Sequence, residues 1–586
     1  MSSLFGMIYT GVSGINAAQV GLDVTGNNIA NMNNEDYSRQ SVSLVSARPV
    51  QTVNGQMGTG VKIEQIQRAY DDLLAKSARN EGSAYSYYSS LQTYIDEAML
   101  YFNELEAGSG LGDALQDYFD AWQNLANSAT DGSDSPTIKR TTLLETASIL
   151  AQKIREGYEH LESLKSDAEY NIKNIISDMN LKAQSVADLN KQIAAAEFAG
   201  QPANDLRDAR DALVDQMSEY TTVTTYERDN GQIALMIGGQ LLVDGNHYHM
   251  LEAKENLDTG QFQILWKSGN KNANPVEITS NMSYGSIGAN MKMRNDLLSD
   301  YMGQLDDLAI TLITETNRIH SSGQGLERYS QITGSNSVTN PKFVLSSELG
   351  EFPYEVKQGT FRISFYSSVT DSSGKTNVSE FNVDIDIDPD TDNLYAIIDK
   401  INIAAGEMAE ATLSYENGIS LVAKTGYTMS FGEDTSGFLV AAGLNGFFTG
   451  SSAKNIDIDK TVASNPQYIA TGKTGAEGDN QNAKLLADLG SAVLKSTGGY
   501  SISGFYGVFI GQMTSEKSQA DVFAATKQMS SEQLSTRLQS IRGVSENDEL
   551  LNMSLFQRVF EANSRYINVV DEMLNTLING LGSAGR

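Results

Sequence analysis

Apolar side chains recur every three or four residues at both ends of the chain. Near the C-terminus seven of eight such positions are apolar, the a/d pattern of a coiled coil; they are Met553, Phe556, Phe560, Asn563, Ile567, Val570, Leu574 and Leu577. Near the N-terminus the same spacing is occupied by Leu4, Ile8, Gly11, Ile15, Ala18, Leu22, Thr25 and Ile29. The small residues Gly11, Gly14 and Ala18 would allow another helix to come close. Each end therefore predicts a helix that packs against a partner helix.

The need for a partner sets an expectation about folding. Burying a large apolar side chain contributes roughly 1.5–3 kcal/mol, so the C-terminal stripe would contribute on the order of 10–20 kcal/mol. Ordering each residue costs roughly 1–2 kcal/mol, and an isolated helix is marginal in water. We therefore expect both ends to be largely disordered in the monomer and to become helical when they pair with neighbouring subunits.

Between the two ends the pattern alternates between helical and strand-like stretches. An asparagine cluster between Asn27 and Asn34 predicts the end of the first helix. Alternation over residues 41–66 then predicts a hairpin-like pair of strands. Predicted helices follow at residues 69–102, 154–193, 301–319, 394–403, 482–494 and 521 to the C-terminus. Predicted strands lie at residues 232–243, 262–266, 361–366 and 381–387, within strand-like regions that begin at about 223 and at 340.

Because helices flank the β-rich stretch, the two ends of the chain must fold together. The predicted fold class is α+β with several domains. Residues 1–36 with 550–586 form a terminal domain in which the N- and C-terminal helices pair in the manner of a coiled coil. Residues 37–335 with 455–549 form a long helical bundle that carries a small β subdomain at about 223–290. Residues 336–454 form an inserted β-rich domain.

Charge separates the ends of the chain from its middle. The formal net charge is −31, of which residues 1–34 contribute −1 and residues 550–586 contribute zero, so the middle carries −30. Such a polyanion is a poor ligand for nucleic acid or an anionic membrane, and neither is an expected partner. The absence of cysteine excludes disulfides and thiolate sites. Residues 1–22 also lack the features of a secretory signal, and no transmembrane helix is expected.

The strongest candidate for a chemical site is the acidic run from Asp384 to Asp392. From Asp388 its spacing is similar to that of an EF-hand loop, but Asn393 replaces the required glycine and Asp399 the bidentate glutamate. The alternative is a strand with an acidic face, a turn at Pro389 and a helix capped by Thr391 or Asp392. We favour that alternative and predict no metal and no cofactor.

Other residue types give no catalytic constellation. His247 and His249 share a strand face with no third ligand in view, and His160 and His320 are isolated. Both Gly-Lys-Thr triplets lack the earlier glycine of a phosphate-binding loop. No nucleophile elbow or zinc-protease motif is present, so we predict that the chain is not an enzyme.

Several different longer motifs are distributed along the whole chain. In the N-terminal part they are Gly11-Val-Ser-Gly-Ile-Asn-Ala-Ala, Thr25-Gly-Asn-Asn-Ile-Ala-Asn, Tyr37-Ser-Arg-Gln and Gly58-Thr-Gly-Val-Lys-Ile with Arg68 and Asp71. Further on they are Trp122-Gln-Asn-Leu-Ala, Ala203-Asn-Asp-Leu-Arg-Asp-Ala-Arg-Asp, Gly238-Gly-Gln-Leu-Leu-Val, Asn465-Pro with Ile469-Ala470, Gly478-Asp-Asn-Gln-Asn-Ala, Phe556-Gln-Arg-Val-Phe-Glu-Ala-Asn-Ser-Arg-Tyr and Asp571-Glu-Met-Leu-Asn-Thr-Leu. With these motifs the chain closely resembles the flagellar hook-associated protein 1 family.

The resemblance implies a structural adaptor between the hook and the filament of the bacterial flagellum. It implies export in an unfolded state through the flagellar type III apparatus, an extracellular location at the hook-filament junction, terminal helices packed in the axial tube and a middle that faces outward. The implied partners are the hook protein, a second junction protein, further copies of the chain, and an export chaperone at the C-terminal helix.

The expected assembly interface comprises both terminal stripes and the nearby asparagines: Leu4, Ile8, Gly11, Gly14, Ile15, Ala18, Leu22, Asn28, Ile29, Asn31, Met553, Phe556, Phe560, Asn563, Ile567, Val570, Leu574 and Leu577. The alternative is a secreted adhesin or binding module whose β region engages an external ligand, with a wall-degrading enzyme as a weaker third candidate. Binding by residues 340–450 could coexist with the adaptor role.

Overall fold

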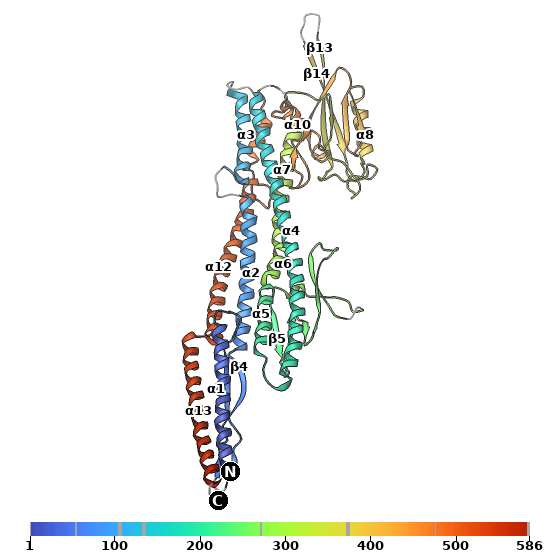
Figure 1. Ribbon diagram of the computed structural model, residues 1–586. Helices are drawn as coiled ribbons and strands as arrows, with labels where there is room; N and C mark the ends of the chain where they lie inside the picture. Colours follow the sequence, from blue (N-terminus) through green and yellow to red (C-terminus); the bar gives the residue numbers. More distant parts are fainter. Residues whose placement is uncertain are drawn as a thin grey trace. The chain divides into compact units, whose positions relative to one another are not determined.

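The computed structural model describes residues 2–52, 55–102, 108–131, 136–269, 272–370, 376–474, 476 and 478–582. The chain forms two compact units, and helices with several small sheets confirm the predicted α+β class (Figure 1). The first unit comprises Met1–Thr93, Asp167–Asn295 and Ser518–Arg586, and the second comprises Tyr94–Ser166 and Asp296–Lys517. Both ends of the chain belong to the first unit. The division into three domains with the boundaries given above stays a prediction.

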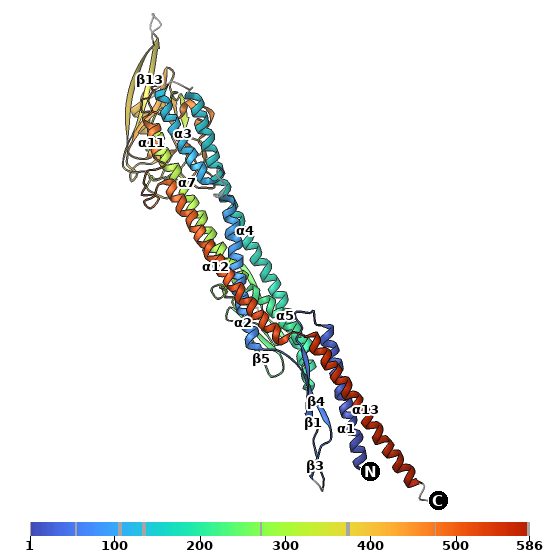
Figure 2. The ribbon, with the colours of Figure 1, turned by 90° about the vertical axis from the view of Figure 1, so that its left-hand side faces the viewer.

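The two terminal stripes are helices, as predicted. Helix α1 spans Ser2–Ala30 and is followed by turns in the asparagine cluster, while α13 spans Glu546–Gly582. The two helices pack against each other within one chain (Figure 2). The expectation that each end requires a neighbouring subunit for its order therefore differs from the structure, because each helix supplies the apolar partner of the other.

The last predicted helix is divided into two. Helix α12 (Ile502–Arg542) begins earlier than expected, and α13 is separate from it. The amide of Gly543 donates to the carbonyl of Gln539, which closes the last turn of α12 before the chain redirects into α13.

Residues 41–66 form the predicted hairpin beside α1. Strands β1 (Gln40–Ser46) and β4 (Val61–Arg68) pair antiparallel, with a bulge between Ser43 and Leu44. Strands β2 (Val50–Thr52) and β3 (Gly55–Met57) form a second short pair toward the hairpin end. Helix α2 (Asp72–Phe102) follows, which confirms the helix predicted from residue 69.

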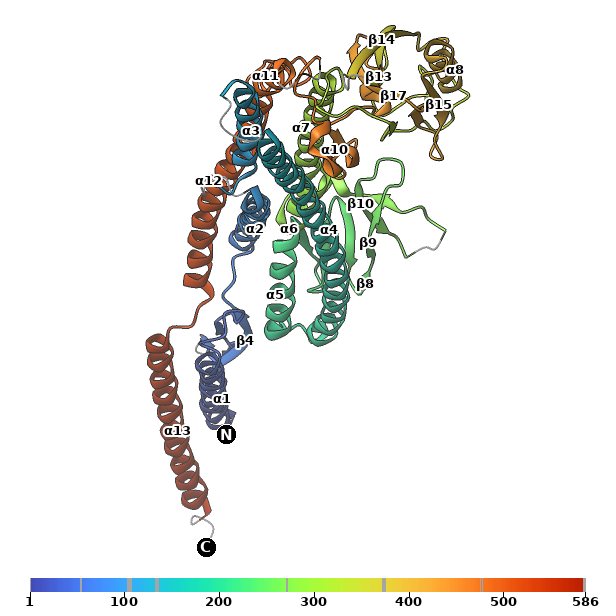
Figure 3. The same ribbon diagram turned by 90° about the horizontal axis from the view of Figure 1, so that it is seen from above.

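The β subdomain of the first unit packs against helices (Figure 3). Its core joins apolar residues of α4 (Pro136–Ala196) and α5 (Asn204–Tyr220) to two sheets and to α6 (Gly285–Lys292). One sheet has the order β5-β6-β7-β8, with strands Val223–Glu227, Ile233–Ile237, Gln240–Asp244 and His247–Tyr248. The other has the order β11-β10-β9, with strands Val276–Glu277, Phe262–Lys267 and Met250–Glu255. The predicted strand pattern from 223 is confirmed.

The second unit contains α3 (Leu111–Asp131), α7 (Leu298–Ser321) and α11 (Gln481–Asp488), together with parts of α2, α4 and α12. Helix α7 confirms the predicted helix 301–319, whereas α11 ends six residues before the predicted end at Leu494. Trp122 is fully buried here, and the centroid of its ring lies 5.3 Å from that of the Phe447 ring. Short elements complete this part: α9 (Phe438–Ala442), β18 (Phe448–Thr449), β19 (Asp457–Ile458) and α10 (Lys460–Ser464).

The inserted β-rich part of the second unit contains two three-stranded sheets. One has the order β14-β13-β17, with strands Thr376–Ile387, Gly359–Thr370 and Tyr427–Asp434. The other has the order β12-β16-β15, with strands Gln331–Thr333, Ile419–Ala423 and Ala409–Leu413. Helix α8 (Leu394–Ala405) confirms the predicted helix, but the predicted cap is wrong. The side chain of Asn393 accepts from the amide of Ala396, whereas Asp392 accepts from the amide of Asp388.

Candidate assembly interface

Glycines on α1 set how closely α13 approaches. A Cβ atom added to Gly11 would lie 2.7 Å from the Ile567 side chain, and one added to Gly14 would lie 2.5 Å from the side chain of Asn563. Gly21, which the 3,4 spacing does not include, is equally close to Phe556, at 2.6 Å. Real Cβ contacts are longer than this, so the close packing of the two helices requires glycine at these positions.

The predicted interface residues largely converge on this contact between the two helices. Ala18, Val570 and both predicted glycines are buried. Most of the remaining positions are half-buried: Leu4, Ile8, Ile15, Leu22, Ile29, Met553, Phe556, Asn563, Ile567 and Leu574. Phe560 and Leu577 stay exposed, at 38% and 39%. The structure thus assigns these residues to a contact within one chain, and their part in contacts between subunits stays a prediction.

A second apolar row on α13 is left exposed by this pairing. Its members recur at helical spacing on another side of the helix and are 38% to 72% exposed: Leu551, Leu555, Val559, Val569 and Met573. On α1, Phe5, Tyr9 and Val12 are also exposed. This row lies outside the a/d positions, which alone were predicted to form the interface.

A buried polar junction fixes the end of α1 to the start of α13. The Asn28 side chain donates from Nδ2 to the Gln40 carbonyl at 2.9 Å and to Glu549 at 3.1 Å, and it accepts from the Tyr37 hydroxyl at 2.8 Å. Glu549 is 1% exposed and also accepts from Arg39 Nε at 2.7 Å. Burial, followed by nearby carboxylates, raises the pKa of Tyr37, so its hydroxyl stays protonated and donates. The predicted interface residue Asn28 is therefore part of a rigid structural junction, whereas the side chain of Asn31 donates to Asn27 one turn earlier in the same helix end.

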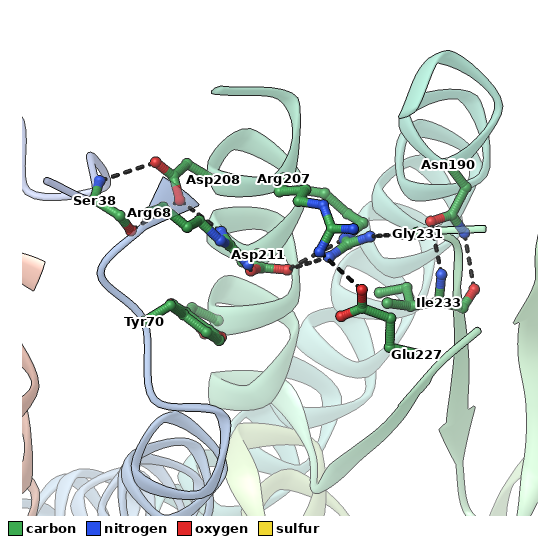
Figure 4. Close-up of polar contacts among 12 residues, drawn as sticks. Ser38, Arg68, Tyr70, Asn190, Arg207, Asp208, Asp211, Glu227, Gly231 and Ile233 are labelled. Atoms are coloured by element: carbon green, nitrogen blue, oxygen red, sulfur yellow. Dashed lines mark hydrogen bonds and ion pairs between the residues drawn. The ribbon is translucent and has the colours of Figure 1, made fainter. Parts of the chain in front are cut away.

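The junction continues into α5 through paired charges (Figure 4). Asp208 accepts from the backbone amide of Ser38 at 2.9 Å and from Arg68 at 2.6 Å, and Arg68 also donates to Asp211 at 2.6 Å. Burial raises the pKa of Asp208. Burial also tends to raise the pKa of Asp211, but the positive charges of Arg210 and Arg68 outweigh burial, and the pKa of Asp211 is lowered. Two motifs that lie far apart in the sequence, Tyr37-Ser-Arg-Gln and the one that begins at Ala203, therefore form one site.

Two further arginines of the α5 motif connect this site to the β subdomain. Arg210 is 1% exposed and donates to the Gly231 carbonyl at 2.8 Å. Arg207 forms ion pairs with Glu197 at 2.6 Å and with Glu227 at 2.8 Å. The junction thus holds together the terminal helices, the hairpin and α5, and its chemistry is that of a structural contact.

The acidic run does not gather around a cation position. Asp384 forms a bidentate ion pair with Arg362, and Asp392 forms an ion pair with Lys400 at 2.6 Å. In the described part of the chain, no group of three or more His, Cys, Asp or Glu residues is placed to hold a metal ion. His249 packs its ring against Trp266, with 4.8 Å between centroids. No helix among the described residues is long and apolar enough to cross a membrane.

Comparison with known proteins adds family information to this geometry. Residues 101–336 match the family described as flagellar hook-associated protein FlgK helical domain. Residues 8–37 match the flagella basal body rod protein family, and residues 540–580 match the C-terminal family of flagellar basal body rod FlgEFG proteins. These matches cover most of α1, most of α13 and, between them, residues 101–336.

Curated relatives match from end to end. Flagellar hook-associated protein 1 of Bacillus subtilis is 24% identical over 100% of both chains, and the protein of that name from Escherichia coli is 24% identical over 99% of this chain and 100% of its own. The solved flagellar hook junction protein FlgK of Burkholderia pseudomallei is 16% identical, with a TM-score of 0.47, and the match covers 79% of this chain and 100% of that one.

The terminal matches define the class, that of flagellar proteins whose two ends resemble rod proteins. Within this class the chain is similar over its full length to flagellar hook-associated protein 1, which confirms the resemblance inferred from its motifs. The family is one of structural proteins of the flagellum.

Proposed function

We propose that this chain is a structural adaptor that joins the flagellar hook to the filament and polymerises through α1 and α13. Its proposed partners are the hook protein, a second junction protein and further copies of itself. It is proposed to reach the extracellular end of the growing flagellum unfolded, through the type III export apparatus. The full-length relationship to hook-associated protein 1 supports the site of action.

The observation that carries the proposal is the exposed apolar row on α13. Pairing with α1 uses one side of α13, and leaves Leu551, Leu555 and Val569 exposed at 72%, 57% and 49%. Burial of such side chains is favourable by roughly 25 cal/mol per Å² of apolar surface removed from water. A layer of identical subunits would cover the row with helices of its neighbours.

The same row suits the proposed binding of an export chaperone. An export chaperone would hold α13 by laying its apolar side into a groove. The near-neutral terminal segments pack without like-charge repulsion, whereas the −30 middle favours a position where water and salt screen it. Because the chain contains no cysteine, folding after export would require no disulfide formation.

The experiment compares two strains. The α13 variant carries both Leu551→Ser and Leu555→Ser, and the control strain carries Leu257→Ser. Leu257 is 89% exposed in a turn of the β subdomain, away from the terminal helices. We expect the α13 variant to produce hooks without filaments and to shed filament subunits into the medium, while its purified monomer melts at the wild-type temperature. The control is expected to swim normally.

Quantifying the variant protein in the medium separates export from assembly. Secretion with no filament supports the assembly role of the row, whereas retention in the cytoplasm locates the defect at the chaperone or export step. Normal filaments on the α13 variant would refute polymerisation through this row. A chain that lacks residues 553–577 would still bind an external ligand if the chain were instead an adhesin.

A further inference from the structure

A shallow polar pocket opens in the inserted β-rich part of the second unit. Its volume is about 460 Å³, which lies within the roughly 300–1,000 Å³ range of small-molecule pockets. Twelve described residues line it, drawn from the loop 333–337, the end of β15, the following turn and Ser420 of β16. Among these twelve there is no Lys or Arg, and Glu416 is the one charged side chain.

Hydroxyl groups of Thr333, Ser414 and Ser420 line the pocket. Thr333 Oγ1 and Ser420 Oγ share a hydrogen bond of 2.9 Å between β12 and β16. The hydroxyl of Ser414 accepts from the amide of Gly418 at 2.9 Å, which leaves its own hydrogen for another acceptor. Such fixed groups can form hydrogen bonds with a ligand at little cost in conformational entropy.

An exposed tyrosine stands at the rim. The turn between β15 and β16 closes through the Asn417 amide, which donates to the Ser414 carbonyl at 3.2 Å, and Asn417 has a φ of 62°. Asparagine tolerates this left-handed conformation, and the turn leaves Tyr415 fully exposed, at 103%. Glu416 beside it is also exposed. No described part of the chain covers the ring of Tyr415.

We propose that this pocket binds a neutral oligosaccharide. One sugar ring stacks the C–H groups of its apolar face on Tyr415, because the face of an aromatic ring is electron-rich. Neighbouring sugar hydroxyls donate to the Glu416 carboxylate and exchange hydrogen bonds with the Ser and Thr hydroxyls of the lining. The lining offers no cation, so phosphate, sulfate and sialic acid groups are repelled by Glu416 rather than paired. This activity goes beyond the adaptor role and does not depend on it.

The test uses the full chain and an array of immobilised neutral and sulfated oligosaccharides. The neutral oligosaccharide with the strongest signal is then measured in solution by saturation-transfer NMR. Tyr415→Ala is expected to weaken binding about tenfold and Tyr415→Phe by less than about threefold, because the ring face is retained. Glu416→Gln is expected to weaken binding severalfold. The matched control is Tyr395→Ala on α8, where the tyrosine is 42% exposed and outside the pocket.

Three results would overturn the proposal: no neutral oligosaccharide binds at up to about 5 mM, sulfated sugars bind more tightly than neutral ones, or Tyr415→Ala binds like the wild type. An unchanged melting temperature of each variant shows that its fold is intact. Tyr415 lies in the second unit and the terminal helices in the first. A strain with Tyr415→Ala is therefore expected to build normal filaments, so failure of this proposal and failure of the adaptor role give different results.

Discussion

At the scale of single residues, the packing of α1 against α13 distinguishes between glycines of the same helix. Gly21 and Gly26 both lie in α1 and both would gain helix propensity of about 1 kcal/mol on substitution by alanine. At Gly21 the new Cβ would lie 2.6 Å from the Phe556 ring, whereas at Gly26 nothing lies within 4 Å. The same substitution should therefore have opposite effects at the two positions.

We predict that Gly21→Ala destabilises the α1/α13 pair by about 1–3 kcal/mol relative to Gly26→Ala, because Phe556 must move. Hydrogen exchange of α13 amides in the purified monomer measures the difference. Faster exchange in Gly21→Ala alone is the expected result. Equal protection in the two variants would show that the close approach of the helices in this structure is not present in solution.

A buried histidine gives the second unit a dependence on pH. The His320 side chain is 0% exposed, with Nδ1 2.9 Å from the Asn445 carbonyl and Nε2 accepting from the Ala470 amide at 2.9 Å. Burial lowers its pKa to about 4. Between this value and about 6.5, the ordinary pKa of histidine, the unfolded chain binds the proton and the folded chain does not. Stability is therefore lost as the pH falls through this window.

We predict that the part of the free energy of unfolding due to this linkage falls by roughly 3 kcal/mol between pH 7 and pH 4. His320→Gln does not titrate, so the stability advantage of the wild type over this variant is expected to shrink across the same window. Urea unfolding at several pH values gives the comparison. A difference that is independent of pH would contradict the assigned cause, whatever the acid sensitivity contributed by carboxylates.

At the scale of elements, the polar junction decides how the terminal helices are joined to the hairpin and α5. Arg68 is 9% exposed in its side chain and serves both Asp208 and Asp211. Arg68→Met would leave two buried carboxylates without this partner, and we expect a loss of about 3–5 kcal/mol in the free energy of unfolding. The matched variant Arg228→Met removes an exposed pair with Asp244 and is expected to cost about 0–1 kcal/mol. Chemical denaturation monitored by hydrogen exchange in α5 tests both.

A similar small effect from both arginine variants would show that the junction is solvated rather than buried. Rescue of Arg68→Met by Asp208→Asn would support the predicted cause, because the carboxylate that lost its arginine partner is then neutral. The prediction concerns stability of the first unit and makes no use of flagellar assembly.

Elements with strong periodicity were predictable from sequence, and contacts between distant motifs were not. The terminal stripes gave α1 and α13 because seven apolar residues repeat at one spacing, and the small residues Gly11 and Gly14 indicated close approach. Gly21 was missed, although it lies one heptad after Gly14 and contacts α13 in the same way. The bond between Asn28 and Glu549 joins residues 521 positions apart, for which no periodicity exists. The cap of α8 was missed by one position because Asp392, Asn393 and Thr391 have similar capping propensity.

At the scale of the whole molecule, the uneven charge of the chain bears on how copies of it associate. The −30 of the middle opposes the approach of neighbouring copies, while the terminal segments contribute −1 and zero. Salt screens this repulsion, since the Debye length falls from about 30 Å at 0.01 M to about 8 Å at 0.15 M ionic strength. Burial of the exposed row on α13 is apolar and persists at high salt.

We predict that self-association of the purified chain increases when NaCl is raised from about 0.02 M to about 0.5 M, as measured by analytical ultracentrifugation. Association through ion pairs between copies would instead weaken with salt, so the sign of the effect separates the two mechanisms. A chain that lacks residues 546–582 retains most of the negative charge but loses the apolar row, and it should stay monomeric at every salt concentration. Leu257→Ser should associate like the wild type. If the truncated chain associates equally well, the contacts between copies do not require α13, which contradicts the assembly role proposed for its exposed row.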